Sequence, residues 1–197
     1  MARKASLPIE HATRHTAIIR DPASMWSKLA WDVEVFRDIQ VSYPDEPEPL
    51  AYAAVNVCIA AWSLRNWVES VRARNQRRLG IDFDRRAFFD EIAQAIPEQA
   101  ACDAIANTAK HARLNDGELA GGRVSLDWQE GDEDCPPGYV LHHLKEDGRY
   151  EGLAVNRFVS LCDHWWTWLE ANAMAIGMRR IPDWQQRKLR RIFGDRP

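Results

Sequence analysis

One short segment combines side chains that together could act on a phosphodiester. Asn107, Lys110 and His111 lie close together, and on a helix Asn107 and His111 share a face that Lys110 borders. The amide could orient a group, the ammonium could neutralise phosphate charge, and the imidazole could carry a proton near neutral pH. These three residues are therefore a candidate catalytic set. The alternative is that Asn107 and His111 hydrogen-bond to the preceding long helix and hold its register.

A second polar set lies on that long helix, which we expect over about 49–79. Its members are Tyr52, Asn56, Ser63, Arg65 and Asn66. Polar groups on a mostly apolar helix need partners when they are buried. We therefore expect the two helices to pack antiparallel and to pool these groups with Asn107 and His111, with Arg65 available to stabilise phosphate charge. A buried polar network without catalysis is the alternative interpretation.

Three segments resemble a group of uncharacterised bacterial proteins with this helix order. They are Tyr52–Asn56, Ala61–Val68 and Ala104–His111. The Asn-x-x-Lys-His element within the last segment is similar to the second half of the motif of HEPN domains. This resemblance covers about 50–113, and it implies a helical-bundle ribonuclease or nucleotide-binding protein of a toxin–antitoxin or phage-defence system.

The resemblance also implies an arginine that is absent here. In that superfamily an arginine that is separated from the histidine by four to six intervening residues works with it on RNA, often across a dimer interface and without metal. Ala104, Ile105 and Ala106 occupy those positions, so a relative without nuclease activity is an alternative. One match to the spacing occurs elsewhere, Arg157 with His164. With 21 arginines and six histidines, about two such matches are expected by chance.

Two arginine-rich clusters could contact phosphate groups. The first is Arg72, Arg74, Arg77 and Arg78, and the second is Arg179, Arg180, Arg187, Lys188, Arg190 and Arg191. Guanidinium groups suit bidentate phosphate contacts, so RNA is the expected partner. Solvated helix ends are the alternative, and the C-terminal helix could instead dock a partner protein. A net charge of −3 excludes a generally cationic nucleic-acid coat.

Metal and cofactor chemistry finds little support in the sequence. Zinc-type ligands are present at Cys135, His142, His143, Cys162 and His164, but their spacing matches no finger or ribbon. The two adjacent histidines would point to opposite faces of a strand. Glycine-rich phosphate loops, nucleophile elbows and His-Glu-x-x-His motifs are all missing from the sequence. We expect no metal and no cofactor, and we expect the other cysteines, Cys58 and Cys102, to be small apolar fillers, as Cys162 would also be on its helix.

Helices must position these residues, and their boundaries follow from local signals. Asp21-Pro22 predicts the start of a helix that runs to about Val41, and Tyr43–Pro49 predicts a stiff, acidic, extended linker. The next helix, about Pro49–Leu79, is closed by Gly80. Its first half is apolar nearly all round, which places it in the middle of a bundle.

Further along the chain, the spacing predicts two more helices, then a sheet, then helices again. We expect one helix from Asp84 to just before Pro97 and another from Pro97 to about Leu114. A small antiparallel sheet over 122–152 follows, with an acidic loop from Gly131 to Gly138. The last two segments are a helix over Val155–Met178 and a short basic helix after Pro182. The fold class is mainly α, or α+β by strict count. It is a helical bundle with a small antiparallel β-hairpin insertion before the last long helix, and it forms one domain over 21–197 after an irregular arm.

Composition sets the functional class. The 197 residues are 46% hydrophobic and 28% charged, and the longest apolar run, Leu50–Trp62, is too short to cross a bilayer. The first twenty residues lack the apolar segment of a secretory signal, so we expect a cytoplasmic protein. Two hypotheses follow: an RNA-directed, HEPN-like protein that could act as a metal-independent ribonuclease, or a non-catalytic helical interaction module such as an antitoxin or a complex subunit. A homodimer or a partner protein is possible in both.

Overall fold

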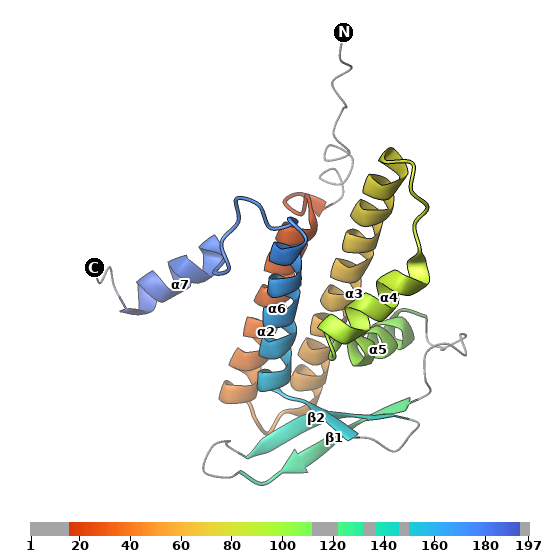
Figure 1. The fold of residues 1–197 in the computed structure, drawn as a ribbon. Coiled ribbons are helices and arrows are strands. Elements are labelled where there is room, and N and C mark those ends of the chain that lie inside the picture. Colours follow the sequence, from red (N-terminus) through yellow and green to blue (C-terminus); the bar gives the residue numbers. More distant parts are fainter. Residues whose placement is uncertain (1–15, 112–121, 132–136, 146–149, 194–197) are drawn as a thin grey trace.

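The computed structural model describes residues 16–111, 122–131, 137–145 and 150–193 (Figure 1). Within these residues the chain forms six helices and one three-stranded antiparallel sheet, which confirms the expected fold class. The elements are α2 (Pro22–Ser42), α3 (Pro47–Arg78), α4 (Arg85–Ala95), α5 (Gln99–His111), β1 (Gly122–Gln129), β2 (Gly138–Lys145), β3 (Tyr150–Leu153), α6 (Val155–Ala171) and α7 (Asp183–Phe193).

Three long helices form the body of the molecule. Figure 1 shows α2, α3 and α6 side by side, the sheet at one end of them, and α4 and α5 lying across α3. Aromatic pairs join α2 to α6: the ring centroids of Trp26 and Trp166 are 4.5 Å apart, and those of Phe36 and Phe158 are 4.9 Å apart. Burial of such large rings provides most of the favourable free energy that holds the two helices together.

Two helix starts follow the local signals and one does not. Asp21 accepts a hydrogen bond from the Ser24 backbone, and Asp84 accepts one from the Ala87 backbone. The predicted extended linker is wrong in its second half, because α3 already begins at Pro47. A proline in the first helical turn lacks only a donor that the helix leaves unpaired there, so it can start the helix instead of preventing it.

Two further boundaries also differ from the prediction. The fourth helix begins at Gln99 and not at Pro97, and α6 ends at Ala171, seven residues before Met178. After α6 the Ala173 backbone has φ of +54°, and the Met174 N–H donates to the Leu169 carbonyl at 2.8 Å. Gly80 forms the same kind of left-handed turn after α3, with φ of +72°. A glycine in this position predicts the end of a helix, but an alanine does not.

The predicted sheet is confirmed, with strand order β1-β2-β3. It is attached to the α2–α3 connection, because the Tyr139 N–H donates to the Pro44 carbonyl at 3.2 Å. Gly138 makes this approach possible: a Cβ atom there would lie 3.1 Å from the Pro44 Cβ. His142 and His143, adjacent on β2, are both buried.

Three helical cysteines are buried and free, as expected: Cys58, Cys102 and Cys162. Burial raises the pKa of the Cys162 thiol, and the hydrogen bond with the neighbouring Cys58 thiol, together with burial, raises the pKa of Cys102. These thiols are therefore inert fillers, while Cys135 lies outside the described residues. No helix in the described part of the chain combines the length and apolar character that a membrane span requires.

The position of α3 differs from the prediction that its apolar half is enclosed on all sides. One face packs against α2 and another is crossed by α5, but a third face is open to solvent. Tyr52 is 68% exposed and Ile59 is 36% exposed. The mainly apolar composition of this segment therefore reflects two buried faces and one exposed apolar stripe.

Candidate functional site

The residues predicted from α5 do not form a joint polar site with α3. Asn107 is half-buried and makes no side-chain hydrogen bond to α3 within the described residues, and Lys110 is exposed. The Lys110 ammonium lies 4.5 Å from the centroid of the Trp62 ring, a cation–π contact. His111 is the last residue of α5, and its side chain lies outside the described part of the chain.

Within the described residues, Tyr52, Asn56 and Ser63 take no part in the predicted pooling with α5, and the part that involves the His111 side chain lies outside these residues. Tyr52 and Asn56 are exposed, and the Ser63 hydroxyl donates to the Ile59 carbonyl of its own helix at 2.8 Å. The physical reason is that Tyr52 and Asn56 lie on the open face of α3, whereas α5 crosses the helix on another face (Figure 1). A spacing rule identifies a face of one helix, but it does not contain the crossing angle with the next.

Arg65 is held in the protein interior by its two terminal guanidinium nitrogens, while its Nε atom is buried without a hydrogen-bond partner among the described residues. Its guanidinium forms an ion pair with Asp103 on α5, and both side chains are 11% exposed. It also lies 4.8 Å from the centroid of the Phe89 ring and donates to the Asn66 side chain at 3.3 Å. A guanidinium held in this way is not available to stabilise an incoming phosphate, so the role expected for Arg65 and the support expected from Asn66 are replaced by structural ones.

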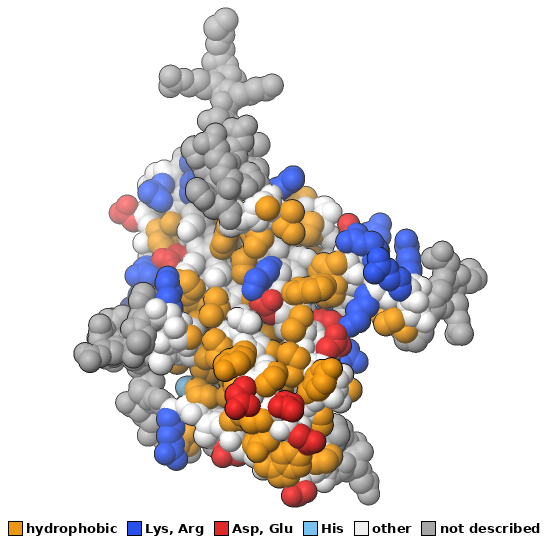
Figure 2. All heavy atoms as spheres, turned by 180° about the vertical axis from the view of Figure 1, so that it is seen from behind, with side chains coloured by type: hydrophobic (Ala, Val, Ile, Leu, Met, Phe, Trp, Pro, Cys, Tyr) orange, Lys and Arg blue, Asp and Glu red, His pale blue; other side chains and the backbone are white. Residues whose placement is uncertain are grey.

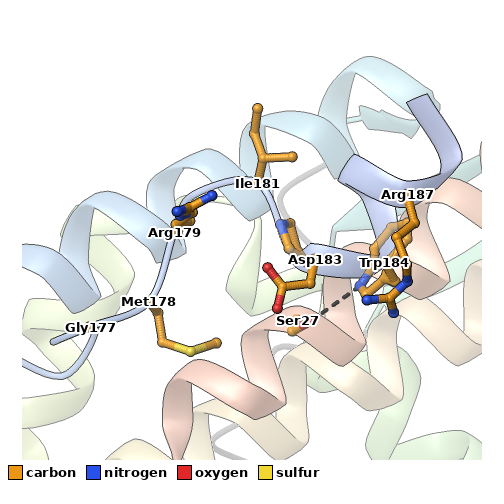
Figure 3. A pocket seen from close by; sticks show the side chains of 9 residues that line it. Ser27, Gly177, Met178, Arg179, Ile181, Asp183, Trp184 and Arg187 are labelled. Carbon is orange, nitrogen blue, oxygen red and sulfur yellow. Dashed lines mark hydrogen bonds between the residues drawn. The ribbon is translucent and has the colours of Figure 1, made fainter. Parts of the chain in front are cut away.

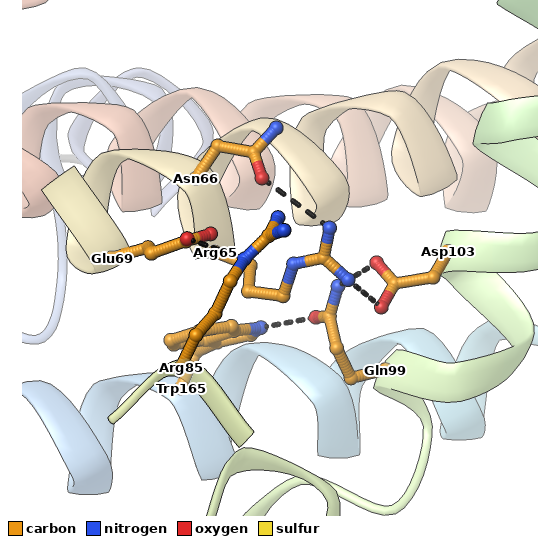
Figure 4. Close-up of polar contacts among 7 residues, drawn as sticks. All are labelled: Arg65, Asn66, Glu69, Arg85, Gln99, Asp103 and Trp165. Atoms are coloured by element: carbon orange, nitrogen blue, oxygen red, sulfur yellow. Dashed lines mark hydrogen bonds and ion pairs between the residues drawn. The ribbon is translucent and has the colours of Figure 1, made fainter. Parts of the chain in front are cut away.

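Arg65 belongs to a polar chain that links three helices, which we call the Arg65 cluster: Arg65, Asp103, Gln99 and Trp165. The Gln99 amide donates to Asp103 at 2.7 Å, and the Trp165 indole donates to Gln99 at 2.8 Å (Figure 4). Burial raises the pKa of Asp103 to about 6, although Arg65 and Gln99 act in the opposite direction. The sequence analysis missed Gln99 and Asp103, although their spacing of four continues the face that carries Asn107.

The predicted phosphate-binding cluster at the end of α3 is only partly free. Arg72 pairs with Glu91 at 2.6 Å, and the Trp168 indole donates to the same carboxylate at 3.0 Å. Arg72 therefore fastens α3 to α4 and α6. Arg77 and Arg78 are exposed at the end of the helix, and Arg74 is half-buried beside them.

The C-terminal basic cluster is likewise bound in part to the body of the protein. Lys188 contacts Glu34 at 2.6 Å and Asp38 at 3.2 Å, and Arg180 pairs with Asp163 at 2.7 Å. These contacts fix α7 and the segment before it against α2 and α6. Part of the positive charge expected to face RNA is thus already neutralised.

The structure brings together a different set of residues, which we call the His164 group: His164, Glu98 and Arg157. The His164 Nδ1 atom lies 2.9 Å from a Glu98 carboxylate oxygen, and a guanidinium nitrogen of Arg157 lies 4.0 Å from the other. Glu98 is 2% exposed, whereas His164 is 43% and Arg157 is 51% exposed. A buried carboxylate thus holds an imidazole and a guanidinium that both face solvent.

Local structure explains how this group forms. Arg157 and His164 are seven residues apart on α6, two helical turns, and therefore share a face. Glu98 precedes α5, where its carbonyl accepts the N–H of Cys102 at 3.3 Å, and a carboxylate at a helix N-terminus is favoured by the helix dipole. The neighbouring Gln99 bonds the neighbouring Trp165, so two consecutive contacts fix the start of α5 to α6.

The arrangement of His164 suits proton transfer. An ionised carboxylate only accepts hydrogen bonds, so Glu98 selects the tautomer in which His164 carries its proton on Nδ1. The Nε2 atom then has a free lone pair. A carboxylate that orients an imidazole in this manner is a general device for acid–base catalysis near neutral pH.

Other parts of the described structure offer less. No three metal-ligating side chains converge within the described residues, and Cys135 lies outside them. An open hollow of about 520 Å³ lies between α2 and the segment before α7 (Figure 3). Arg179 and Arg187 line it together with Asp183, and the Trp184 indole donates to Ser27 at its edge at 3.2 Å. Opposite charges in one open hollow favour no particular ligand.

Comparisons of the chain with protein-family models, with curated proteins and with solved structures found no match. The geometry of the His164 group and the residues around it therefore provide the basis for inferring a function.

Proposed function

We propose that the protein is RNA-directed and cleaves phosphodiester bonds without a metal ion, using His164 as the proton-transfer group. The observation that supports this proposal is the exposed imidazole fixed by the buried Glu98 carboxylate, with the Arg157 guanidinium on the same face. The HEPN-like resemblance implies the same activity. It points to residues on α5, whereas our proposal assigns the reaction to His164 and Arg157 on α6. A role in a defence or toxin–antitoxin module belongs to the same proposal.

The chemistry requires only groups that the His164 group supplies. The His164 Nε2 atom accepts the proton of a ribose 2′-hydroxyl, and the oxygen attacks the adjacent phosphorus. The bond to the 5′-oxygen breaks, and the imidazolium returns the proton to that leaving oxygen. The products are a 2′,3′-cyclic phosphate and a 5′-hydroxyl, and Arg157 stabilises the negative charge that develops on the phosphoryl oxygens. The need for a 2′-hydroxyl selects RNA over DNA.

The non-catalytic alternative also has an observation in its favour. In the Arg65 cluster every partner is a protein side chain, as expected of a network that only holds a scaffold together. If the His164 group had the same task, the protein would be an interaction module. The two functions differ in a direct assay of RNA cleavage.

The test uses purified protein, a fluorescently labelled single-stranded RNA and a chelator of divalent metal ions. We expect cleavage in the chelator, with loss of about 100-fold or more in rate for His164→Ala and Arg157→Ala. Arg85→Ala is the matched control, because Arg85 on α4 is also an exposed arginine paired with a partly buried carboxylate, that of Glu69, and belongs to neither arginine-rich cluster. Its rate should stay within about twofold.

Two outcomes would contradict the proposal. One is an absence of cleavage by the unmodified protein on RNAs of varied sequence. The other is full activity in His164→Ala with loss of activity in His111→Ala, which would return the reaction to the α5 segment with Asn107 and Lys110. Circular dichroism of each variant separates loss of chemistry from loss of fold.

A further inference from the structure

The open face of α3 carries a stripe that no element of the described chain covers. Tyr52, Asn56, Ile59 and Ser63 follow one another at steps of four, three and four, so they lie along one side of the helix. Tyr52, Asn56 and Ile59 are exposed, and Ser63 is half-buried. Figure 2 shows the molecule from behind, where hydrophobic side chains spread over the middle and lower part of the face and acidic side chains lie among them in the lower part.

The two ends of α3 carry opposite charge. Glu48 lies in the first turn beside Asp45 and Glu46, whereas Arg74, Arg77 and Arg78 lie in the last two turns. The side-chain charges match the helix dipole: the acidic turn lies at its positive end and the basic turn at its negative end. A helix with this pattern is complementary to a second copy of itself in the antiparallel direction.

We propose that α3 is the interface of a symmetric homodimer, in which it pairs antiparallel with α3 of a second copy around a two-fold axis at Ser63. This inference does not depend on the proposed ribonuclease activity, because the stripe lies on α3 and the His164 group on α6. An isologous interface of this kind is the commonest form of homo-oligomer.

The register follows from the symmetry. A residue a given number of positions before Ser63 meets the residue the same number of positions after Ser63 in the second copy. Tyr52 then meets Arg74 of the second copy in a cation–π pair, and Glu48 meets its Arg78 in an ion pair. The small Ser63 side chain at the axis allows the two backbones to approach closely.

Apolar contacts lie on the two sides of the axis, next to Ser63. Ile59 meets Trp67 of the second copy, and both side chains are partly exposed in the single chain. By symmetry, one such contact lies on each side of the axis. The charged pairs lie further out at the two ends, as in the usual interface with apolar contacts inside and a charged rim. A second copy fits the stripe better than a nucleic acid does, because Glu48 with its acidic neighbours would repel phosphate groups.

Charge reversal at the two ends tests this pairing. Glu48 and Arg78 are 30 residues apart on one helix, about 45 Å, so they cannot contact each other within one chain. We expect light scattering to give twice the 22.6 kDa mass of the chain. Glu48→Arg alone and Arg78→Glu alone should each weaken the dimer about tenfold in Kd, because each change places like charges together at two sites. The double variant should return to the original Kd.

A disulfide at the axis gives a second measurement. In a Cys135→Ser background, Ser63→Cys should form a covalent dimer under mild oxidation, because the two-fold axis brings the two thiols together. Thr167→Cys is the matched control: Thr167 is exposed on α6, and like Ser63 its hydroxyl bonds the carbonyl four residues earlier. A monomer at all concentrations, failure of the double charge variant to recover, or equal cross-linking of the control would each overturn the proposal.

Discussion

Two polar groups meet at the start of α5, and they differ mainly in their access to water. Gln99 and Trp165 belong to the Arg65 cluster, whereas their sequence neighbours Glu98 and His164 belong to the His164 group. The Arg65–Asp103 pair is 11% exposed on both sides, but the imidazole of His164 is 43% exposed. Glu98 and His164 are thus one residue away from Gln99 and Trp165, yet they form a group that is open to water, whereas the Arg65 cluster is shielded from it.

This comparison shows how one piece of scaffold supports two tasks. The sealed cluster links α3, α5 and α6, because breaking the Arg65–Asp103 pair or the Gln99 hydrogen bonds would leave buried polar groups without partners. In the proposed function the open group depends on this support, since Glu98 holds His164 from the start of α5. Rigid support beneath an accessible group is the general condition for an effective site.

The largest effect is expected from breaking the sealed pair. Arg65→Ala should lower the free energy of unfolding by about 3–5 kcal/mol, because Asp103 would remain buried without its counter-charge and Phe89 would still exclude water. Urea unfolding followed by circular dichroism measures the change. The double variant Arg65→Met with Asp103→Leu should lose less than Arg65→Ala alone, since it removes the stranded charge. A loss below about 1 kcal/mol in Arg65→Ala would show that the pair behaves like a surface pair.

The second effect concerns pH. Asp103 has a pKa of about 6 in the folded protein and 3.8 as its ordinary value, so between these values the folded state binds more protons than the unfolded state. The contribution of Asp103 to the free energy of unfolding is present at pH 4 and is lost as the pH rises to about 6. The loss amounts to roughly 2–3 kcal/mol. Asp103→Asn cannot ionise. We therefore expect the difference in unfolding free energy between the original protein and Asp103→Asn to change over this range and to stay constant above it.

The opposite slope, or a constant difference from pH 4 to pH 7, would contradict this prediction. Either result would mean that Arg65 outweighs burial and holds Asp103 ionised throughout.

Much of the fold could be predicted from local chemistry. The Asp21 and Asp84 caps and the Gly80 end act through neighbouring backbone groups, so the sequence alone contains their cause. The end of α6 could not be predicted in this way, because Ala173 adopts a left-handed backbone that most alanines avoid. Its conformation depends on how the following residues pack.

The candidate site was less accessible from sequence. Asp103 and Arg65 lie 38 positions apart, and only the crossing of α5 over α3 brings them together. The spacing of Arg157 and His164 is visible in the sequence, but chance matches of that kind are common. What distinguishes this match is Glu98, which reaches it from another element 66 positions away. Pairwise spacing cannot contain that third residue.

The smallest effect is expected in the open group. His164→Ala should lower the free energy of unfolding by about 1 kcal/mol, because the space left by an imidazole that is 43% exposed opens to solvent and water can bond Glu98 instead. The same urea titration measures this change. A loss as large as that of Arg65→Ala would show that His164 is part of the scaffold, and it would remove the distinction between the two groups.

Double-mutant cycles make the comparison quantitative, because they isolate the coupling between two side chains from the other effects of each substitution. The cycle of Arg65→Ala with Asp103→Ala should give a coupling energy of several kcal/mol, and the cycle of Glu98→Ala with His164→Ala should give about 1 kcal/mol or less. The physical reason for this order is that water competes for Glu98 once the imidazole is gone but cannot reach Asp103. Equal coupling energies in the two cycles would mean that exposure of the imidazole has no energetic consequence, and the proton-transfer role of His164 would then lose the openness on which it depends.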